Sequence, residues 1–162
     1  GEAVGKIASA LAEVDPENAS QYLNIAQLQQ QDIAAKGEVL KAELEAGNMS
    51  QVNVICAEMI TGFVEWTGFN VIASYPRPED LTLKEHQELV AKAKEAGVAL
   101  VIDNLQSGAN AGVTIAEELG AIQVTLSNSP GGFDNTETWE KAVEKNVDLL
   151  LEALARYRGS SI

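Results

Sequence analysis

The sequence predicts an α/β fold in which one long helix is followed by a four-stranded parallel sheet, with helices covering both faces of the sheet. Two observations predict it. Short, continuous apolar runs alternate with helical stretches along the second part of the chain, as is typical of parallel strands buried on both faces. The first part instead carries apolar residues at helical spacing. We expect a helical segment over residues 1–47 and an α/β lobe over residues 48–162.

The helical segment is expected to contain a short helix over 1–14 and a long helix over 16–46. Pro16 stands between them, and proline is favoured at the first position of a helix. The long helix would span roughly 45 Å, since about 30 residues rise by about 1.5 Å each. Gly47 and Asn48 are residues that commonly end a helix.

The lobe is expected to contain four strands, each marked by a short apolar run. They lie at 52–56, 71–74, 98–102 and 121–126. The helical stretches lie at 58–67, 82–96, 109–119 and 135–157. Because crossovers between parallel strands are right-handed, this alternation fixes most of the topology.

The charge of the chain excludes one class of partner. The 162 residues include 11 Lys and Arg against 24 Asp and Glu, giving a net charge of −13. A field of this sign repels phosphate backbones and anionic membrane surfaces. We therefore expect no nucleic-acid partner. No apolar run approaches the roughly 20 residues of a spanning helix, so membrane association is expected only through an anchor or a docking partner.

Few residues of the chain are suited to catalysis. Cys56, the only cysteine, ends an apolar run and is expected to be an inert small hydrophobic residue. His86, the only histidine, lies within a charged helical stretch and is expected on a solvated face. The sequence has no nucleophile elbow, zinc-protease helix or phosphate-binding glycine motif. We expect a binding protein rather than an enzyme.

Candidate ligand-binding residues follow from the predicted sheet, since ligands of open parallel sheets bind outside the carboxyl ends of the strands. The polar residues at those ends are Glu58, Asp103, Asn104, Ser127 and Asn128. Each has a structural alternative. Glu58, Asp103 and Asn104 are suited to capping a following helix, and Ser127 and Asn128 are suited to a turn. The residue types alone leave both interpretations open.

The loop over 127–135 supplies a second hypothesis about function. Its Gly131 and Gly132 can either form a backbone nest for a phosphate or simply turn the chain into the last helix. A nest would suit a flavodoxin-like enzyme or regulatory domain that binds a small phosphorylated ligand at the strand ends. This is the alternative to a solute-binding lobe.

Four segments of the chain resemble a known family, the helical-backbone receptors of zinc and manganese ABC transporters. The segments are ALAEVDPENASQYLNIAQ at 10–27, ICAEMITGFVEWTGFNVI at 55–72, the stretch at 81–132 and the closing helix at 135–157. The third carries the strongest resemblance, through its helix, its apolar strand, Gln106 and the run AEELGA.

The resemblance implies a receptor with two α/β lobes joined by a backbone helix, which binds a metal between the lobes and delivers it to a membrane permease. This chain would be the backbone helix and the second lobe. The first lobe, usually the richer in histidine, would be a missing partner. The resemblance also implies a periplasmic or extracellular location and leaves lipid anchoring, the particular metal and the oligomeric state undefined.

The resemblance also assigns metal ligands. Glu58 falls at the first ligand position of the lobe, and a glutamate there resembles the manganese-type members. Asn128 stands where the family usually has an aspartate, and Asn104 stands where many members have a glutamate. Asp103 and Ser127 are expected to line the same site. Because fewer anionic ligands weaken a hard-cation site, we expect weak binding of a zinc-type or manganese-type ion by this chain alone, or a cargo such as a metal chelate.

Overall fold

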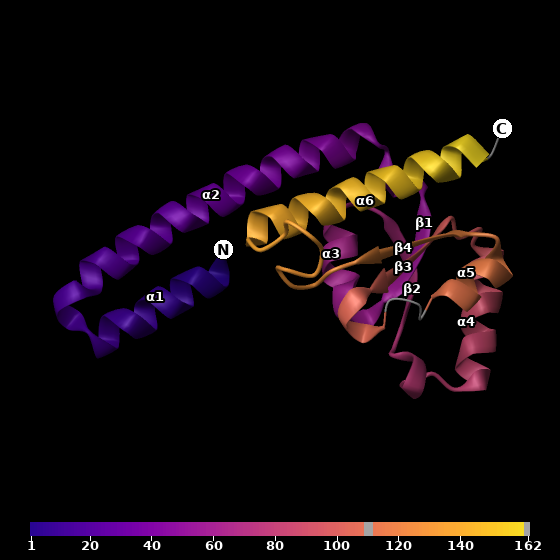
Figure 1. The fold of residues 1–162 in the computed structure, drawn as a ribbon, viewed down its shortest axis with the longest axis horizontal. Coiled ribbons are helices and arrows are strands. Elements are labelled where there is room, and N and C mark those ends of the chain that lie inside the picture. The colour runs from indigo at the N-terminus through magenta and orange to yellow at the C-terminus, as the bar shows by residue number, and fades with distance from the viewer. Residues whose placement is uncertain (109–111, 161–162) are drawn as a thin grey trace. The chain divides into compact units, whose positions relative to one another are not determined.

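The computed structural model describes residues 1–108 and 112–160, and it confirms the predicted α/β fold class. The chain forms two compact units, over residues 1–42 and 43–162. Figure 1 shows the helices of the first unit and the sheet of the second, coloured along the chain. The assignment of a helical domain to 1–47 and a ligand-binding lobe to 48–162 stays a prediction.

The first unit consists of α1 (Glu2–Val14) and most of α2 (Ala19–Ala46), which continues past the boundary of the unit. A short 3₁₀ turn joins the two helices. The Asp15 carboxylate accepts hydrogen bonds from Asn18 Nδ2 at 2.9 Å and from the Tyr22 hydroxyl at 2.8 Å. These bonds, the one from Asn18 first, hold the pKa of Asp15 below its ordinary value. The long helix ends before Gly47, as predicted.

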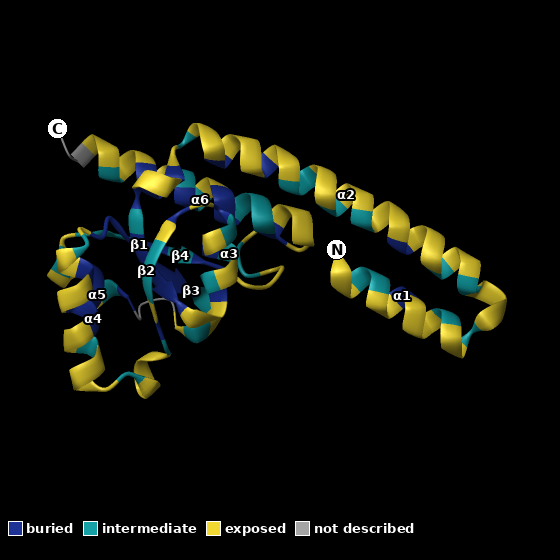
Figure 2. Cartoon of the chain, turned by 180° about the vertical axis from the view of Figure 1, so that it is seen from behind, coloured by how far each residue is buried: buried dark blue, intermediate teal, exposed yellow. Residues whose placement is uncertain are grey.

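The second unit is built on a sheet of four parallel strands in the order β2-β1-β3-β4. The strands are β1 (Asn53–Ala57), β2 (Asn70–Tyr75), β3 (Leu100–Asn104) and β4 (Ile122–Leu126). Every residue of β3 is buried, as are the last four of β1 (Figure 2). Helices cover both sides of these central strands, which explains their continuous apolar runs.

One irregularity interrupts the pairing of β1 with the edge strand β2. Val54 pairs with Val71, whereas Ile55 pairs with Ala73, so Ile72 is an extra residue in β2. Such a β-bulge shifts the register of the strand by one position beyond it. Tyr75 consequently lies level with the last residue of β1.

The helices of the lobe form two layers around the sheet (Figure 1). They are α3 (Thr61–Trp66), α4 (Leu83–Glu95), α5 (Val113–Leu119) and α6 (Trp139–Ser160). Helices α3 and α6 pack on one face, α3 against β1 and β2 and α6 against β3 and β4; α4 and α5 contact each other on the opposite face. Residues 109–111 of the helix predicted over 109–119 lie outside the described residues. None of the described helices combines the length and apolarity needed to cross a bilayer.

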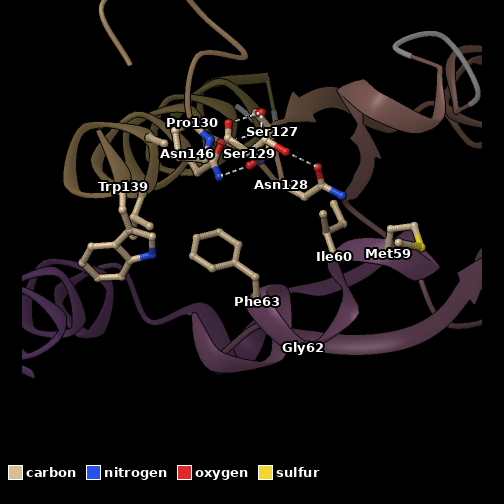
Figure 3. Close-up of a pocket in the computed structure, with 12 residues that line it drawn as sticks. Met59, Ile60, Gly62, Phe63, Ser127, Asn128, Ser129, Pro130, Trp139 and Asn146 are labelled. Atoms are coloured by element: carbon tan, nitrogen blue, oxygen red, sulfur yellow. Dashed lines mark hydrogen bonds between the residues drawn. The ribbon is translucent and has the colours of Figure 1, made fainter. Parts of the chain in front are cut away.

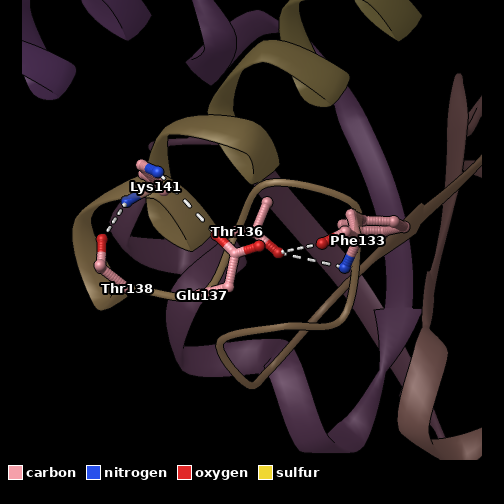
Figure 4. Close-up of polar contacts among 5 residues, drawn as sticks. All are labelled: Phe133, Thr136, Glu137, Thr138 and Lys141. Atoms are coloured by element: carbon pink, nitrogen blue, oxygen red, sulfur yellow. Dashed lines mark hydrogen bonds and ion pairs between the residues drawn. The ribbon is translucent and has the colours of Figure 1, made fainter.

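The last helix begins at Trp139 rather than at the predicted position 135. Asn135 has a positive φ of 60°, a left-handed conformation that does not continue into a helix. Thr138 instead caps the helix, since its Oγ1 accepts a hydrogen bond from the Lys141 amide at 3.4 Å (Figure 4). The helix therefore begins later than predicted, because Asn135 is in a left-handed turn and Thr138 provides the cap.

The strand order reverses its direction of winding between β1 and β3. The chain leaves β1 toward β2 through α3 on one face, and it leaves β3 toward β4 through α5 on the other face. The connections from these neighbouring strands thus diverge at their carboxyl ends. Such a point, where the direction of winding reverses, is where open α/β sheets bind ligands.

Shortening a side chain in β3 tests how far the lobe depends on this sheet. Ile102 is completely buried, and we expect Ile102→Ala to lower the free energy of unfolding by about 2–5 kcal/mol, through lost apolar burial and the cavity left behind. Urea denaturation followed by circular dichroism measures this loss. The control is Leu83→Ala, at a residue 74% exposed, for which a change within about 0.5 kcal/mol is expected. Equal losses for both variants would contradict the described core.

Candidate ligand site at the carboxyl edge of the sheet

The five residues predicted to bind ligand lie at the same edge of the sheet. Glu58 follows β1 directly, Asp103 and Asn104 end β3, and Ser127 and Asn128 follow β4. Because the strands are parallel, their carboxyl ends all meet at this edge. Glu58 and Asn104 leave neighbouring strands, whereas the chains at Glu58 and Asn128 are separated by β3, or roughly 10 Å for two strand spacings.

Asp103 is fully buried, and both of its carboxylate oxygens already accept hydrogen bonds. Oδ1 accepts from the Tyr75 hydroxyl at 2.7 Å and from the Gly112 amide at 2.7 Å. Oδ2 accepts from Gln123 Nε2 at 2.6 Å. Burial raises the pKa of Asp103, and the three hydrogen bonds oppose that shift. We therefore do not include Asp103 among the proposed ligands, because its oxygens stabilise the protein itself.

Tyr75 and Gly112 pack closely against the Asp103 carboxylate. Burial, followed by the negative charge of Asp103, raises the pKa of the Tyr75 hydroxyl, which also donates to the carbonyl oxygen of Ile102 at 3.1 Å. A Cβ atom at Gly112 would approach the Tyr75 hydroxyl to 2.8 Å and Asp103 Oδ1 to 2.9 Å. Only glycine allows the backbone amide at position 112 to reach the carboxylate in this way.

Asn104 has an unusual environment for a buried side chain. It is 1% exposed, and its Nδ2 donates to Ser107 Oγ at 2.8 Å. No described residue donates to its Oδ1, although that atom is buried. Most buried polar atoms in native proteins have a hydrogen-bond partner, so an exception needs an explanation. An amide oxygen without a donor, at the carboxyl end of β3 and next to β1, is suited to a cation.

Both backbone polar groups of Ser127 are bonded to one side chain, that of Asn146. Its amide donates to Asn146 Oδ1 at 3.0 Å, and its carbonyl oxygen accepts from Asn146 Nδ2 at 2.7 Å. Its hydroxyl donates to the carbonyl oxygen of Ser129 at 2.8 Å and accepts from Gln106 Nε2 at 2.7 Å. Ser127 therefore positions the loop after β4, with its hydrogen-bonding groups already in use.

Asn128 is exposed and follows this fixed point. Its amide donates to Gln106 Oε1 at 3.1 Å, so the Gln106 side chain bridges the loops after β3 and β4. Within the described residues, the Asn128 side chain forms one hydrogen bond, in which the hydroxyl of its neighbour Ser129 donates to Asn128 Oδ1 at 3.2 Å. Its amide group can thus turn toward a ligand without breaking a buried hydrogen bond.

A cavity of about 300 Å³ opens beside Asn128, between α3 and α6 (Figure 3). Most of its lining is apolar, including Met59, Ile60, Phe63, Pro130, Trp139 and Val143. Its buried polar side chains are already engaged, since Asn146 binds the backbone of Ser127 and the Ser127 hydroxyl binds Gln106 and Ser129. The lining therefore offers mainly apolar contact rather than metal ligands.

A second cavity, of about 170 Å³, lies at Glu58, and we call it the Glu58 cavity. Its charged lining residues are Glu58, Arg77 and Asp80. Among the described residues, the Glu58 carboxylate has no hydrogen-bond or ion-pair partner. In the same part of the chain, no group of three His, Cys, Asp or Glu residues is placed to hold a metal ion. A metal at Glu58 would therefore need further ligands from amides, water or another molecule.

The glycines after β4 do not form a free phosphate nest. The Gly131 amide donates to the carbonyl oxygen of Thr136 at 2.6 Å, and the Phe133 amide donates to Thr136 Oγ1 at 3.1 Å (Figure 4). A Cβ atom at Gly132 would come within 2.6 Å of Ser127 Cβ. The glycines therefore allow a tight turn against Ser127.

Cys56 is buried, and His86 is partly buried. Cys56 is completely buried, its Sγ lies 3.6 Å from Thr61 Oγ1, and burial raises the pKa of its thiol to about 11. His86 was expected on a solvated face, but its side chain is only 22% exposed and its Nε2 lies 3.8 Å from Glu118 Oε1. The contact between α4 and α5 accounts for this difference.

Three residues that shape the site were missed by the sequence analysis. Asn146 lies three residues after Val143, on the apolar stripe of the last helix, and a polar residue at such a position is the signal that could have identified it. Tyr75 ends β2 and Arg77 lies two residues beyond it, and the sequence analysis gave neither side chain a role. Neither carries a sequence signal as strong as that of Asn146.

The solved structures that resemble this chain include periplasmic metal-binding proteins. The metal-free mutant and the manganese-bound form of a periplasmic metal-binding protein from Candidatus Liberibacter asiaticus match with TM-scores of 0.77 and 0.75, at 17% and 16% identity. The SBP FpvC of Pseudomonas aeruginosa, solved in complex with Ni²⁺, matches with a TM-score of 0.70 at 20% identity. The fold is thus that of a lobe of periplasmic metal-binding proteins.

The matches cover 93% of this chain in the first protein and 94% in the second. The chain spans only 57–58% of the length of those proteins. The family itself is shown by sequence: the chain belongs to the zinc-uptake complex component A periplasmic family (ZnuA), whose model matches residues 1–153. No protein with a curated description matches the sequence.

The hydrogen bond between Tyr75 and Asp103 can be tested by Tyr75→Phe. We expect a loss of about 1–3 kcal/mol in the free energy of unfolding at pH 7, because a buried carboxylate loses a donor. The pKa of Asp103 is already raised, and losing a donor to its charged form raises it further. The deficit should therefore grow as the pH rises from 4 to 7. Tyr22→Phe, at a hydroxyl bonded to the partly exposed Asp15, is the control with a much smaller expected loss.

The burial of Cys56 predicts an unreactive thiol. With a pKa of about 11, the group is protonated at pH 8, and its burial blocks a reagent. We expect native protein to react with Ellman's reagent far more slowly than protein unfolded in urea, which should release one equivalent per chain. Reaction of the native protein at the rate of the unfolded protein would contradict the burial of this strand.

Proposed function

We propose that this chain is the backbone helix and second lobe of a receptor that binds a divalent metal ion and delivers it to an ABC-transporter permease. One observation carries the proposal. Glu58 offers a carboxylate without a partner, and Asn104, at the end of the neighbouring strand, holds a buried oxygen without a donor among the described residues. A cation held between the two strand ends would satisfy both groups.

Family membership and the similar structures support this proposal. The family is described as a periplasmic component of a zinc-uptake complex. The solved relatives include forms bound to cadmium, manganese and nickel. Since the chain spans 57–58% of those proteins, the remaining ligands would come from a first lobe outside this sequence.

The type of ligand favours a hard cation. Glu58 would supply a carboxylate oxygen, and Asn104 and Asn128 would supply amide oxygens. Oxygen ligands suit manganese, whereas zinc sites are usually rich in histidine and cysteine. We propose a manganese-type ion as the preferred cargo, bound weakly by this lobe alone because it carries a single carboxylate at the ligand positions.

The remaining parts of the proposal follow from the family. The receptor would work in the periplasm or outside the cell, either anchored by lipid or free, and would meet the membrane through its anchor or its permease. Binding and release of the ion would need no catalytic group, so we propose a receptor rather than an enzyme.

The alternative, a domain that binds a phosphorylated ligand, is not favoured. The amide of Gly131 donates within its own loop rather than toward a ligand. The net charge of −13 also opposes a phosphate. Family membership points instead to uptake of an ion.

Glu58→Gln tests the proposal by removing the charge while keeping the shape of the side chain. We expect the affinity for Mn²⁺ to fall by at least about 10- to 100-fold, since that is the loss typical of a residue that only orients a metal ligand, and Glu58 is proposed as a ligand itself. Isothermal titration calorimetry measures it. Glu152→Gln, at an exposed position of α6, is the control with the same change in charge. The proposal would be wrong if both variants bound Mn²⁺ like the unmodified protein, or if no divalent ion bound at all.

A further inference from the structure

We infer that the Glu58 cavity receives the divalent metal together with a small, singly charged oxygen anion, the metal against the Glu58 carboxylate and the anion against the Arg77 guanidinium. The cargo would thus be a metal carboxylate complex rather than a bare ion. This inference rests on the proposed function and specifies its substrate.

Opposite charges share this cavity without neutralising each other. Glu58, Asp80 and Arg77 all line it and are all exposed. Within the described residues, Arg77 forms no ion pair with either carboxylate, so its guanidinium lies beyond 4.0 Å from their oxygens. A ligand that carries both signs can occupy the space between them and satisfy both.

The backbone conformation at Arg77 is restricted by its neighbours. Arg77 stands between Pro76 and Pro78, and its φ of −62° and ψ of 153° are the extended conformation that a following proline imposes. Its carbonyl oxygen accepts a hydrogen bond from the Asp80 amide at 2.9 Å, in the short turn that follows. The Arg77 side chain thus leaves the backbone at a defined position at the carboxyl edge of the sheet, and not from a long loop.

The charge balance distinguishes the two kinds of cargo. Two carboxylates and one guanidinium give the lining a net charge of −1. Against the lining of this lobe alone, a bare divalent cation would leave an excess positive charge beside a guanidinium, which repels it. A divalent cation that carries one monovalent anion balances the charges that this lobe supplies. The guanidinium also presents paired donors that match the geometry of a carboxylate.

The size of the cavity agrees with a complex. The cavity measures about 170 Å³, whereas a space of roughly 10–15 Å³ on the same measure already holds one water molecule. A metal ion with a small hydroxycarboxylate can therefore enter it, whereas a bare ion would leave most of it to water. Ser107, which also lines the cavity, binds the Nδ2 of Asn104, and so connects the cavity to the unpartnered amide oxygen.

Calorimetry with Mn²⁺, in the presence and absence of lactate, tests the inference. Lactate carries one negative charge and chelates a metal through its carboxylate and hydroxyl groups. We expect lactate to tighten Mn²⁺ binding by at least tenfold, relative to methanesulfonate at the same concentration. Arg77→Gln should abolish that enhancement and leave the affinity for Mn²⁺ alone unchanged or several-fold tighter. Arg156→Gln, an equal charge change at an exposed position of α6, should keep the enhancement.

The outcomes separate this inference from the function on which it rests. If Mn²⁺ binds equally well with and without lactate, or if Arg77→Gln keeps the full enhancement, the inference is wrong and the metal receptor stands. If lactate binds without any metal, the cavity is an anion site and the inference is again wrong. If Mn²⁺ binds under neither condition, both the inference and the proposed function are wrong.

Discussion

The buried carboxylate of Asp103 connects elements that are far apart in the sequence. It ends β3, accepts a hydrogen bond from Tyr75 on β2 across the intervening β1, and accepts another from Gln123 on β4. The Gly112 amide adds the start of α5. A buried charge is costly unless it is well paired, and here the pairing orders the carboxyl edge of the whole sheet. The residues that face solvent at this edge depend on that order.

The polar groups at this edge consequently fall into two sets, those with hydrogen-bond partners in the protein and those without an ion-pair partner. Asp103, Ser127, Asn146 and Gln106 bind one another or nearby backbone groups and hold the strand ends in place. Glu58 and Arg77 have no ion-pair partner among the described residues. Groups of the first kind stabilise the lobe, and groups of the second kind remain available to a ligand. This division could not be read from residue types, because a carboxylate belongs to each set.

The fold was largely predictable and the roles of individual polar residues were not. The apolar runs identified all four strands, since parallel strands buried on both faces leave a strong signal. The boundaries shifted where turn chemistry intervened, as at Asn135 before α6. Asp103 and Glu58 both follow apolar runs, yet one is fully buried and the other exposed. That difference depends on contacts with Tyr75 and Gln123, which the linear sequence does not encode at any fixed spacing.

The extra residue in β2, Ile72, affects the position of Tyr75 three residues further along the strand. With uninterrupted pairing, Tyr75 would fall one position further along, about 3.3 Å beyond its present level, and its ring would lie on the other side of the pleat. The hydroxyl would then miss the carboxylate two strands away. The single extra residue in the edge strand β2 thus determines where the Tyr75 hydroxyl lies, and so whether it reaches Asp103.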